Sequence, residues 1–114
     1  MYQFAYDEII EDSSAEARDR EAAAFDEANR LLQSAMRGDD PQAVAVALRF
    51  NEELWMILIE DLAHPGNKWP ETMRASLISI GIWVIKEVER IRRGQSSGFM
   101  AIAEINAIIR DGLN

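Results

Sequence analysis

This chain of 114 residues contains no cysteine, one histidine and three prolines. Without cysteine there is no disulfide, no thiolate nucleophile and no cysteine-ligated zinc, and this composition fits a reducing compartment. One histidine is too few for the two Glu-x-x-His motifs of a di-iron helical bundle. The sequence also contains no P-loop, nucleophile elbow or glycine-rich dinucleotide motif. We therefore expect no enzyme activity, no metal site and no cofactor.

Long hydrophobic runs are also missing. The longest apolar run, Leu77 to Ile85, falls well short of the roughly 20 residues that a membrane span requires. The first residues, MYQFAYDEIIEDSS, have neither the basic nor the apolar region of a signal peptide. Hydrophobic residues make up 48% of the chain and charged residues 28%, which is typical of a globular protein. We expect a single domain over residues 1–114 that is soluble, cytoplasmic and not attached to a membrane.

Basic residues are scarce, and their distribution matters more than their number. The chain has 12 bases against 20 acids, which gives a net charge of −8. Residues 1–40 carry 11 acids and four bases, whereas residues 68–94 carry six bases and three acids. Binding to a nucleic-acid backbone requires clustered Lys and Arg, and most of this surface would repel a polyanion. We expect no direct nucleic-acid binding from the chain as a whole.

Helical periodicity and helix-end motifs predict two helices in the first half of the chain. The first begins at the capping box Ser13 to Glu16 and stops at Gly38. The second begins at Pro41, because Asp40 is a favourable N-cap and proline is tolerated at the first helical position. Its apolar stripe continues to Ala63 and is wider than one neighbouring helix requires.

Two more helices are predicted in the second half. The third begins at Pro70 and stops at Gly94, with an apolar run that must be covered on several sides. Gly81 inside it costs about 1 kcal/mol relative to alanine, so we expect another segment to approach closely there. The fourth helix follows the polar turn at residues 95–98 and ends at Gly112. Short connections between four helices favour an antiparallel bundle.

Three aromatic residues, Tyr2, Phe4 and Tyr6, precede the first predicted helix. They either form a strap that ties the terminus to the bundle, or occupy an apolar groove until a client helix takes it. The fold that we predict is an all-α, antiparallel four-helix bundle with an N-terminal strap.

Two isolated polar residues have a structural and a functional interpretation. His64 lies at the end of the second helix, which favours a role as a partner of the helix dipole over that of a phosphotransfer histidine exposed in mid-helix. Asn51 interrupts the apolar stripe of the same helix, and is either an amide with satisfied hydrogen bonds or a contact to a partner.

A basic cluster occupies the last turns of the third helix: Lys86, Arg90, Arg92 and Arg93. Positive charge at a helix C-terminus complements the helix dipole, which is the simplest interpretation. The alternative is a docking patch for an acidic partner or a small nucleic-acid footprint.

Four segments of the chain are recognisable together: MYQFAYDEIIEDSSAEARDRE, LWMILIEDLAHPGN, RASLISIGIWVIKEVERIRRG and EINAIIRDGL. Over nearly the whole chain they resemble the FlaF family of flagellar biosynthesis regulators of alphaproteobacteria. The resemblance implies a cytoplasmic regulator of flagellin production that acts after transcription, in concert with the companion regulator FlbT. It also implies association with flagellin, in a role like that of a secretion chaperone. The layout is similar, more distantly, to that of the general flagellin chaperone FliS.

A carrier for the amphipathic terminal helices of flagellin needs an apolar groove, and the surplus apolar rows of the second and third helices suit that task. We predict that the groove is formed or bordered by Tyr2, Phe4, Tyr6, Trp55, Trp69, Ile82 and Trp83. The alternative is that the three tryptophans are core residues. Two other functions compete with flagellin binding: translational regulation by RNA binding through the basic cluster, and service as an adaptor for FlbT.

Overall fold

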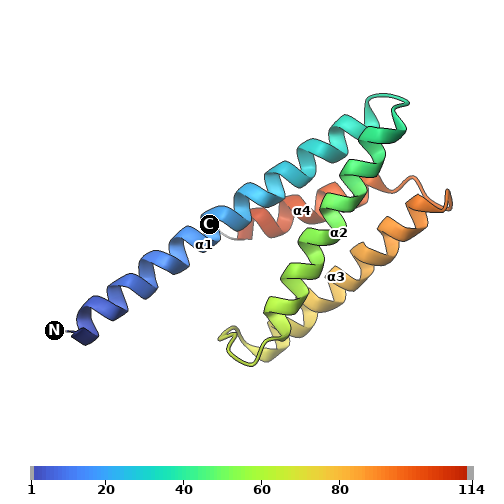
Figure 1. The fold of residues 1–114 in the computed structure, drawn as a ribbon. Helices are drawn as coiled ribbons and strands as arrows, with labels where there is room; N and C mark the ends of the chain where they lie inside the picture. Colours follow the sequence, from blue (N-terminus) through green and yellow to red (C-terminus); the bar gives the residue numbers. More distant parts are fainter. Residues whose placement is uncertain (1, 113–114) are drawn as a thin grey trace.

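The computed structural model describes the backbone of residues 2–112 and the side chains of residues 15–112. It contains four helices: α1 (Tyr2–Met36), α2 (Pro41–Ala63), α3 (Glu71–Arg92) and α4 (Phe99–Gly112). Consecutive helices run in opposite directions, and the first half of α1 extends well past the other three helices (Figure 1). The prediction of an all-α four-helix bundle is confirmed.

The start of α1 differs from the prediction. The helix begins at Tyr2, so the capping box at Ser13 lies inside it, and residues 2–6 are helical rather than an extended strap. No glycine or proline occurs between Tyr2 and Met36, so nothing in the backbone interrupts the helical hydrogen bonds. Ser and Glu can cap a helix, but they are also tolerated within one, and here the uninterrupted helix prevails.

The other helix ends agree with the predictions to within one or two residues. The Asp40 carboxylate accepts a hydrogen bond from the backbone N–H of Gln42 at 3.0 Å, and Pro41 occupies the first turn of α2. Beyond the end of α3, Gly94 has a φ of +72°, a left-handed conformation that side chains other than glycine adopt at a cost.

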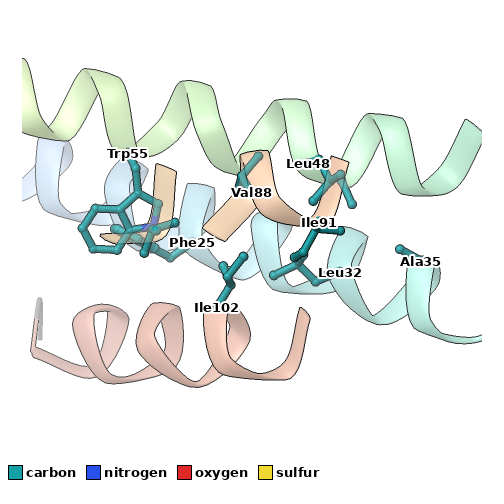
Figure 2. Packing of buried hydrophobic residues seen from close by; sticks show 10 residues of the cluster. Phe25, Leu32, Ala35, Leu48, Trp55, Val88, Ile91 and Ile102 are labelled. Carbon is teal, nitrogen blue, oxygen red and sulfur yellow. The ribbon is translucent and has the colours of Figure 1, made fainter. Parts of the chain in front are cut away.

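The core is built from one face of each helix. Leu32 and Phe25 of α1 meet Leu48 and Trp55 of α2, together with the inner residues of α3 and Ile102 of α4 (Figure 2). The rings of Phe25 and Trp55 pack edge to face, with their centroids 5.6 Å apart. Such aromatic pairs contribute about 0.5–1.5 kcal/mol beyond the area that they bury.

A network of buried amides joins three of the helices. The Asn106 amide of α4 donates hydrogen bonds to the side-chain oxygens of Asn29 on α1, at 3.0 Å, and of Asn51 on α2, at 2.8 Å. Its own oxygen accepts a hydrogen bond from the Trp55 indole at 2.8 Å. Asn51 in turn donates to the backbone oxygens of Ala47 and Ala28. Because hydrogen bonds are directional and these groups are satisfied in the observed arrangement, the network stabilises the way α1, α2 and α4 fit together.

Helix α3 is held differently, by close packing against α2. A Cβ atom added to Gly81 would lie 2.8 Å from two side-chain carbons of Ile59 and 3.0 Å from Cε3 of Trp55. The predicted close approach at Gly81 is therefore confirmed. An ion pair between Arg92 and Glu52 joins the two helices near the end of α3.

The bundle is not closed on all sides. Within the described residues, extensive packing joins α1 to α2, α2 to α3 and α1 to α4, whereas α3 and α4 do not pack extensively against each other. Helix α4 has 14 residues and α3 has 22, so α4 is too short to cover the whole of α3. In the part of the chain that the structure describes, no helix is long and apolar enough to span a membrane.

Candidate functional site

The uncovered side of the bundle contains an apolar hollow between α3 and α4. Its volume is about 170 Å³, smaller than the roughly 300–1,000 Å³ of a typical small-molecule site. It is lined by Glu21, Phe25, Leu58, Trp69, Met73, Leu77, Ile108, Ile109 and Gly112, which come from all four helices and the α2–α3 turn. A shallow apolar hollow of this kind fits side chains that project from a partner protein.

Two further hollows open beside it and share Glu21 and Leu58. One, of about 270 Å³, lies between α1 and the α2–α3 turn, where Asn67 and Trp69 line it. The other, of about 340 Å³, lies between α1 and α2, where Leu54 lines it. We call the three hollows together the open-end groove.

The rim of the open-end groove is apolar and exposed. Trp69 is 40% exposed, Met73 51% and Ile108 70%. Single exposed apolar residues are common on protein surfaces, but a contiguous group around a hollow marks an interaction site. The open-end groove is therefore the candidate site of this protein.

The charged residues of the groove are mainly acidic. Partial burial, followed by the nearby Asp61 carboxylate, raises the pKa of Glu21, while Arg20 partly opposes the effect. Glu21 thus carries its negative charge in a position where neither solvent nor a positive side chain fully compensates it.

The floor of the groove is rigid. Phe25 forms part of it and packs on Trp55, whose indole is fixed by its hydrogen bond to Asn106 (Figure 2). Within the described residues every buried side-chain nitrogen and oxygen has a hydrogen-bond partner. A preformed floor lowers the cost of binding, because fewer side chains must be ordered when a partner docks.

The predicted tryptophans have three different placements. Trp69 borders the groove, as the sequence-based hypothesis had it. Trp55 is fully buried, so its prediction as a groove residue is wrong and it is a core residue. There its ring is packed on all sides and its N–H donates a hydrogen bond to Asn106. Trp83 and its neighbour Ile82 are 42% and 44% exposed on α3, but they line none of the three hollows.

The remaining predicted aromatic residues are Tyr2, Phe4 and Tyr6. Their backbone belongs to α1, and their side chains lie outside the part of the structure that is described. Their contact with a partner stays a prediction.

The basic cluster is largely neutralised by neighbouring acids. Arg90 pairs with the buried Glu87 at 3.0 Å, and Arg93 pairs with Glu89 at 3.0 Å. Arg92 contacts both Glu89 and Glu52. Among the described residues Lys86 forms no ion pair. This arrangement favours the structural interpretation of the cluster over a phosphate-binding patch.

The isolated polar residues have structural partners. Asn51 is the fully buried, hydrogen-bonded amide that one of the two interpretations predicted. His64 caps the end of α2, and its Nδ1 atom accepts a hydrogen bond from the Gly66 N–H at 2.9 Å. Within the described residues, no group of three His, Asp or Glu side chains is placed to hold a metal ion.

Sequence reasoning missed several groove residues: Glu21, Met73, Leu77 and Ile108. Met73 and Leu77 belong to the inner stripe of α3 and were expected to be covered. The sequence contained one indication that these α3 residues are exposed, namely the short predicted length of the last helix. A helix that ends at Gly112 cannot shield the first turns of α3. Ile108 lies outside the apolar stripe that the spacing of Ile102, Ile105 and Ile109 gives the last helix, and it is 70% exposed.

The fold and the groove together define a class: an all-α helical-bundle protein with an apolar surface groove. The family model described as flagellar protein FlaF matches residues 2–113, and the chain belongs to this family. Comparisons with curated proteins and with solved structures give no match. The resemblance noted in the sequence is thereby confirmed, and it makes the protein a flagellar one.

Proposed function

We propose that this protein binds flagellin in the cytoplasm, holds it before export and thereby regulates flagellin synthesis after transcription. Membership of the FlaF family supports a flagellar role. The open-end groove supports protein binding rather than catalysis, and we propose no enzyme activity. The client is an amphipathic helix near a terminus of flagellin, laid in the groove with its apolar stripe inward.

The observation that carries this proposal is the uncovered first half of α3. Met73 and Leu77 continue the stripe that buries Val84 and Val88 further along the helix, yet Met73 is 51% exposed and Leu77 is only half-buried. A client helix placed between α3 and α4 would complete the bundle there. The burial of apolar surface would supply the free energy of association.

Regulation follows from occupancy of the same site. A bound client helix covers the groove, so the free and the loaded protein present different surfaces. A companion regulator such as FlbT that recognises one of the two states would connect the supply of flagellin to its synthesis. Binding to FlbT is part of this proposal.

The primary experiment is a titration of the purified protein with full-length flagellin and with its carboxy-terminal segment, followed by calorimetry. We expect a complex with a Kd in the micromolar range or tighter. If neither full-length flagellin nor its carboxy-terminal segment forms a complex, the proposal is refuted.

Matched variants test the place of binding. Met73→Asp puts a charge on the groove, and Met100→Asp puts the same charge on a similarly exposed methionine elsewhere. Both residues lie in the first turn of their helices, so the effect of the added charge on the helix dipole is similar. We expect at least a tenfold loss of flagellin affinity for the first variant and less than a twofold change for the second.

The competing functions give different results in the same assay. Translational regulation by direct RNA binding requires tight, salt-resistant binding of flagellin leader RNA that Lys86→Ala weakens. A pure FlbT adaptor would bind neither flagellin nor RNA unless FlbT is present. We expect RNA binding to be weak and to vanish as salt is raised, because the arginines of the basic cluster are already paired.

A further inference from the structure

The open-end groove has charges of predominantly one sign close to its apolar surface. Glu21 is the charged residue that lines the hollow between α3 and α4. Glu21 and Asp61 together line the hollow between α1 and α2, which no basic residue lines. Arg18 joins them only in the third hollow, beside the α2–α3 turn. An apolar partner would thus meet two carboxylates at the centre of the groove.

These carboxylates are poorly compensated within the chain. The described residues offer Glu21 no hydrogen bond and no ion pair, and its pKa is raised by burial and by Asp61. Arg20, whose charge partly offsets this effect, is an exposed residue that lies 4.0 Å from Glu16. A helix that brought a positive charge to this place would offset a repulsion that the empty protein retains.

The candidate occupants differ in charge. The chain's own N-terminal segment carries Asp7, Glu8, Glu11 and Asp12 and has no basic residue before Arg18. A second copy of the chain has a net charge of −8. The N-terminal segment would add negative charge next to Glu21 and Asp61, and a second copy would approach with a net charge of the same sign, whereas a helix with basic residues beside its apolar stripe would be attracted.

We propose that the open-end groove selects an amphipathic partner helix in which a Lys or Arg flanks the apolar stripe and pairs with Glu21 and Asp61. This inference rests on the proposed function, since flagellin supplies the helix. It adds a rule of recognition: apolar side chains enter the hollows, and the sign of the flanking charge decides which helices are accepted. A helix with an acidic flank is rejected by like-charge repulsion.

The test is calorimetric titration of the full chain with the carboxy-terminal segment of flagellin. Glu21→Gln and Asp61→Asn each remove one charge and preserve size. Asp19→Asn and Glu53→Gln remove the same charge from exposed positions that line none of the hollows. We expect the first two variants to bind about fivefold more weakly and the controls to stay within about twofold of the wild type. Glu21→Gln removes a charge that folding disfavours, so loss of folding is not expected, and the Tm verifies this.

A charge reversal makes the test specific. Basic residues of the flagellin segment are replaced by Gln one at a time, and the one whose loss weakens binding most is then replaced by Glu. We expect the acidic segment to bind the wild type at least tenfold more weakly. Binding should recover at least threefold with Glu21→Lys and not with Asp19→Lys.

The possible outcomes distinguish a failure of the charge rule from a failure of the proposed flagellin binding. Flagellin binding that is unchanged by Glu21→Gln, by Asp61→Asn and by salt would overturn the charge rule and leave the proposed function standing. If no form of flagellin binds, both fail. A dimer of the isolated chain that Met73→Asp dissociates would show a second copy in the groove, and that also overturns the inference.

Discussion

The two ends of this bundle are packed to different degrees. At the end that holds the α1–α2 and α3–α4 turns, Leu32, Leu48, Val88 and Ile102 are enclosed. We call this the closed end. At the opposite end, the α2–α3 turn carries the exposed Trp69, and α3 and α4 carry the exposed Met73 and Ile108 of the open-end groove. The hollows of the open-end groove thus lie toward the end of the bundle that holds the α2–α3 turn, opposite the α1–α2 and α3–α4 turns (Figure 1).

The amide network stands between the two ends. It joins α1, α2 and α4 by directional hydrogen bonds, whereas α3, which also borders the groove, is held by close packing against α2. Hydrophobic burial alone is non-directional and would favour a collapsed, closed bundle. The comparison teaches that directional hydrogen bonds between buried polar groups can fix how helices are arranged beside an apolar groove.

The largest expected effect is the loss of this network. Asn106→Ala removes three hydrogen bonds and leaves the Trp55 indole and the Asn51 oxygen without partners. Each unsatisfied buried group costs about 1–3 kcal/mol, so we expect the free energy of unfolding to fall by about 3–5 kcal/mol. Urea denaturation measures it. Glu104→Ala, at an exposed position of the same helix, is the control, and a loss below about 1 kcal/mol for Asn106→Ala would show that the network is dispensable.

The second prediction concerns the attachment of α3. Gly81→Ala improves helix propensity by about 1 kcal/mol but places a methyl group against Ile59 and Trp55. Because Trp55 is fixed by its hydrogen bond, we expect a net destabilisation of about 1–3 kcal/mol in thermal or urea unfolding. Gly38→Ala, which lies outside the helices and has free space around the new methyl group, is the control for the added methyl group alone. An increase in stability for Gly81→Ala would contradict the close packing.

The third prediction separates two tryptophans of nearly equal exposure. Trp69 borders the groove and Trp83 does not, so Trp69→Ala should weaken flagellin binding about tenfold, equivalent to about 1.4 kcal/mol. Trp83→Ala should change the affinity less than twofold. Calorimetry measures both affinities, and circular dichroism confirms folding. A stronger effect of Trp83→Ala would move the binding surface to the outer face of α3.

The smallest expected effect is a pH dependence of stability at the open end. Because the pKa of Glu21 is raised above 4.5 in the folded state, the folded protein binds this proton more tightly than the unfolded chain. The resulting stabilisation is complete below the unfolded pKa and is lost as the pH rises through the folded pKa. After solvent screening we expect no more than about 0.5 kcal/mol.

Other carboxylates have a lowered pKa in the folded state, so their contribution to stability changes with pH in the opposite direction. A difference measurement is therefore needed. Hydrogen bonds from arginines lower the pKa values of Glu27 and Glu89, and the stability they contribute is lost as the pH falls. The Tm of the wild type minus that of Glu21→Gln, measured from pH 4 upward, isolates Glu21. A difference that does not change with pH would contradict the raised pKa.

Much of the fold was predictable from local chemistry. Asp40 and Pro41 start α2 as predicted, and Gly94 ends α3, because capping and backbone conformation depend on a few neighbouring residues. The start of α1 was mispredicted for a related reason: the capping box at Ser13 is a local motif, and the motif alone does not tell whether the helix already runs through it.

The site was less predictable. Trp55 and Trp69 are the same residue type, both in or next to apolar stripes, yet one is buried and the other borders the groove. Glu21 looked like one of many acids on a solvated helix face. Its special position depends on Leu58 and Asp61, which lie on another helix, and periodicity within one helix carries no information about that neighbour.

The sequence by itself determined the four helices, their antiparallel order and the surplus of apolar surface, because these depend on local backbone preferences and on the period of the side chains. Only the tertiary structure decided where that surplus lies. The short α4 leaves the first turns of α3 uncovered, and the hydrogen bonds of Asn106 fix α4 against α1 and α2. The physical reason is that the coverage of an apolar surface depends on which helices meet and in what register. Both are decided only when the helices pack against one another.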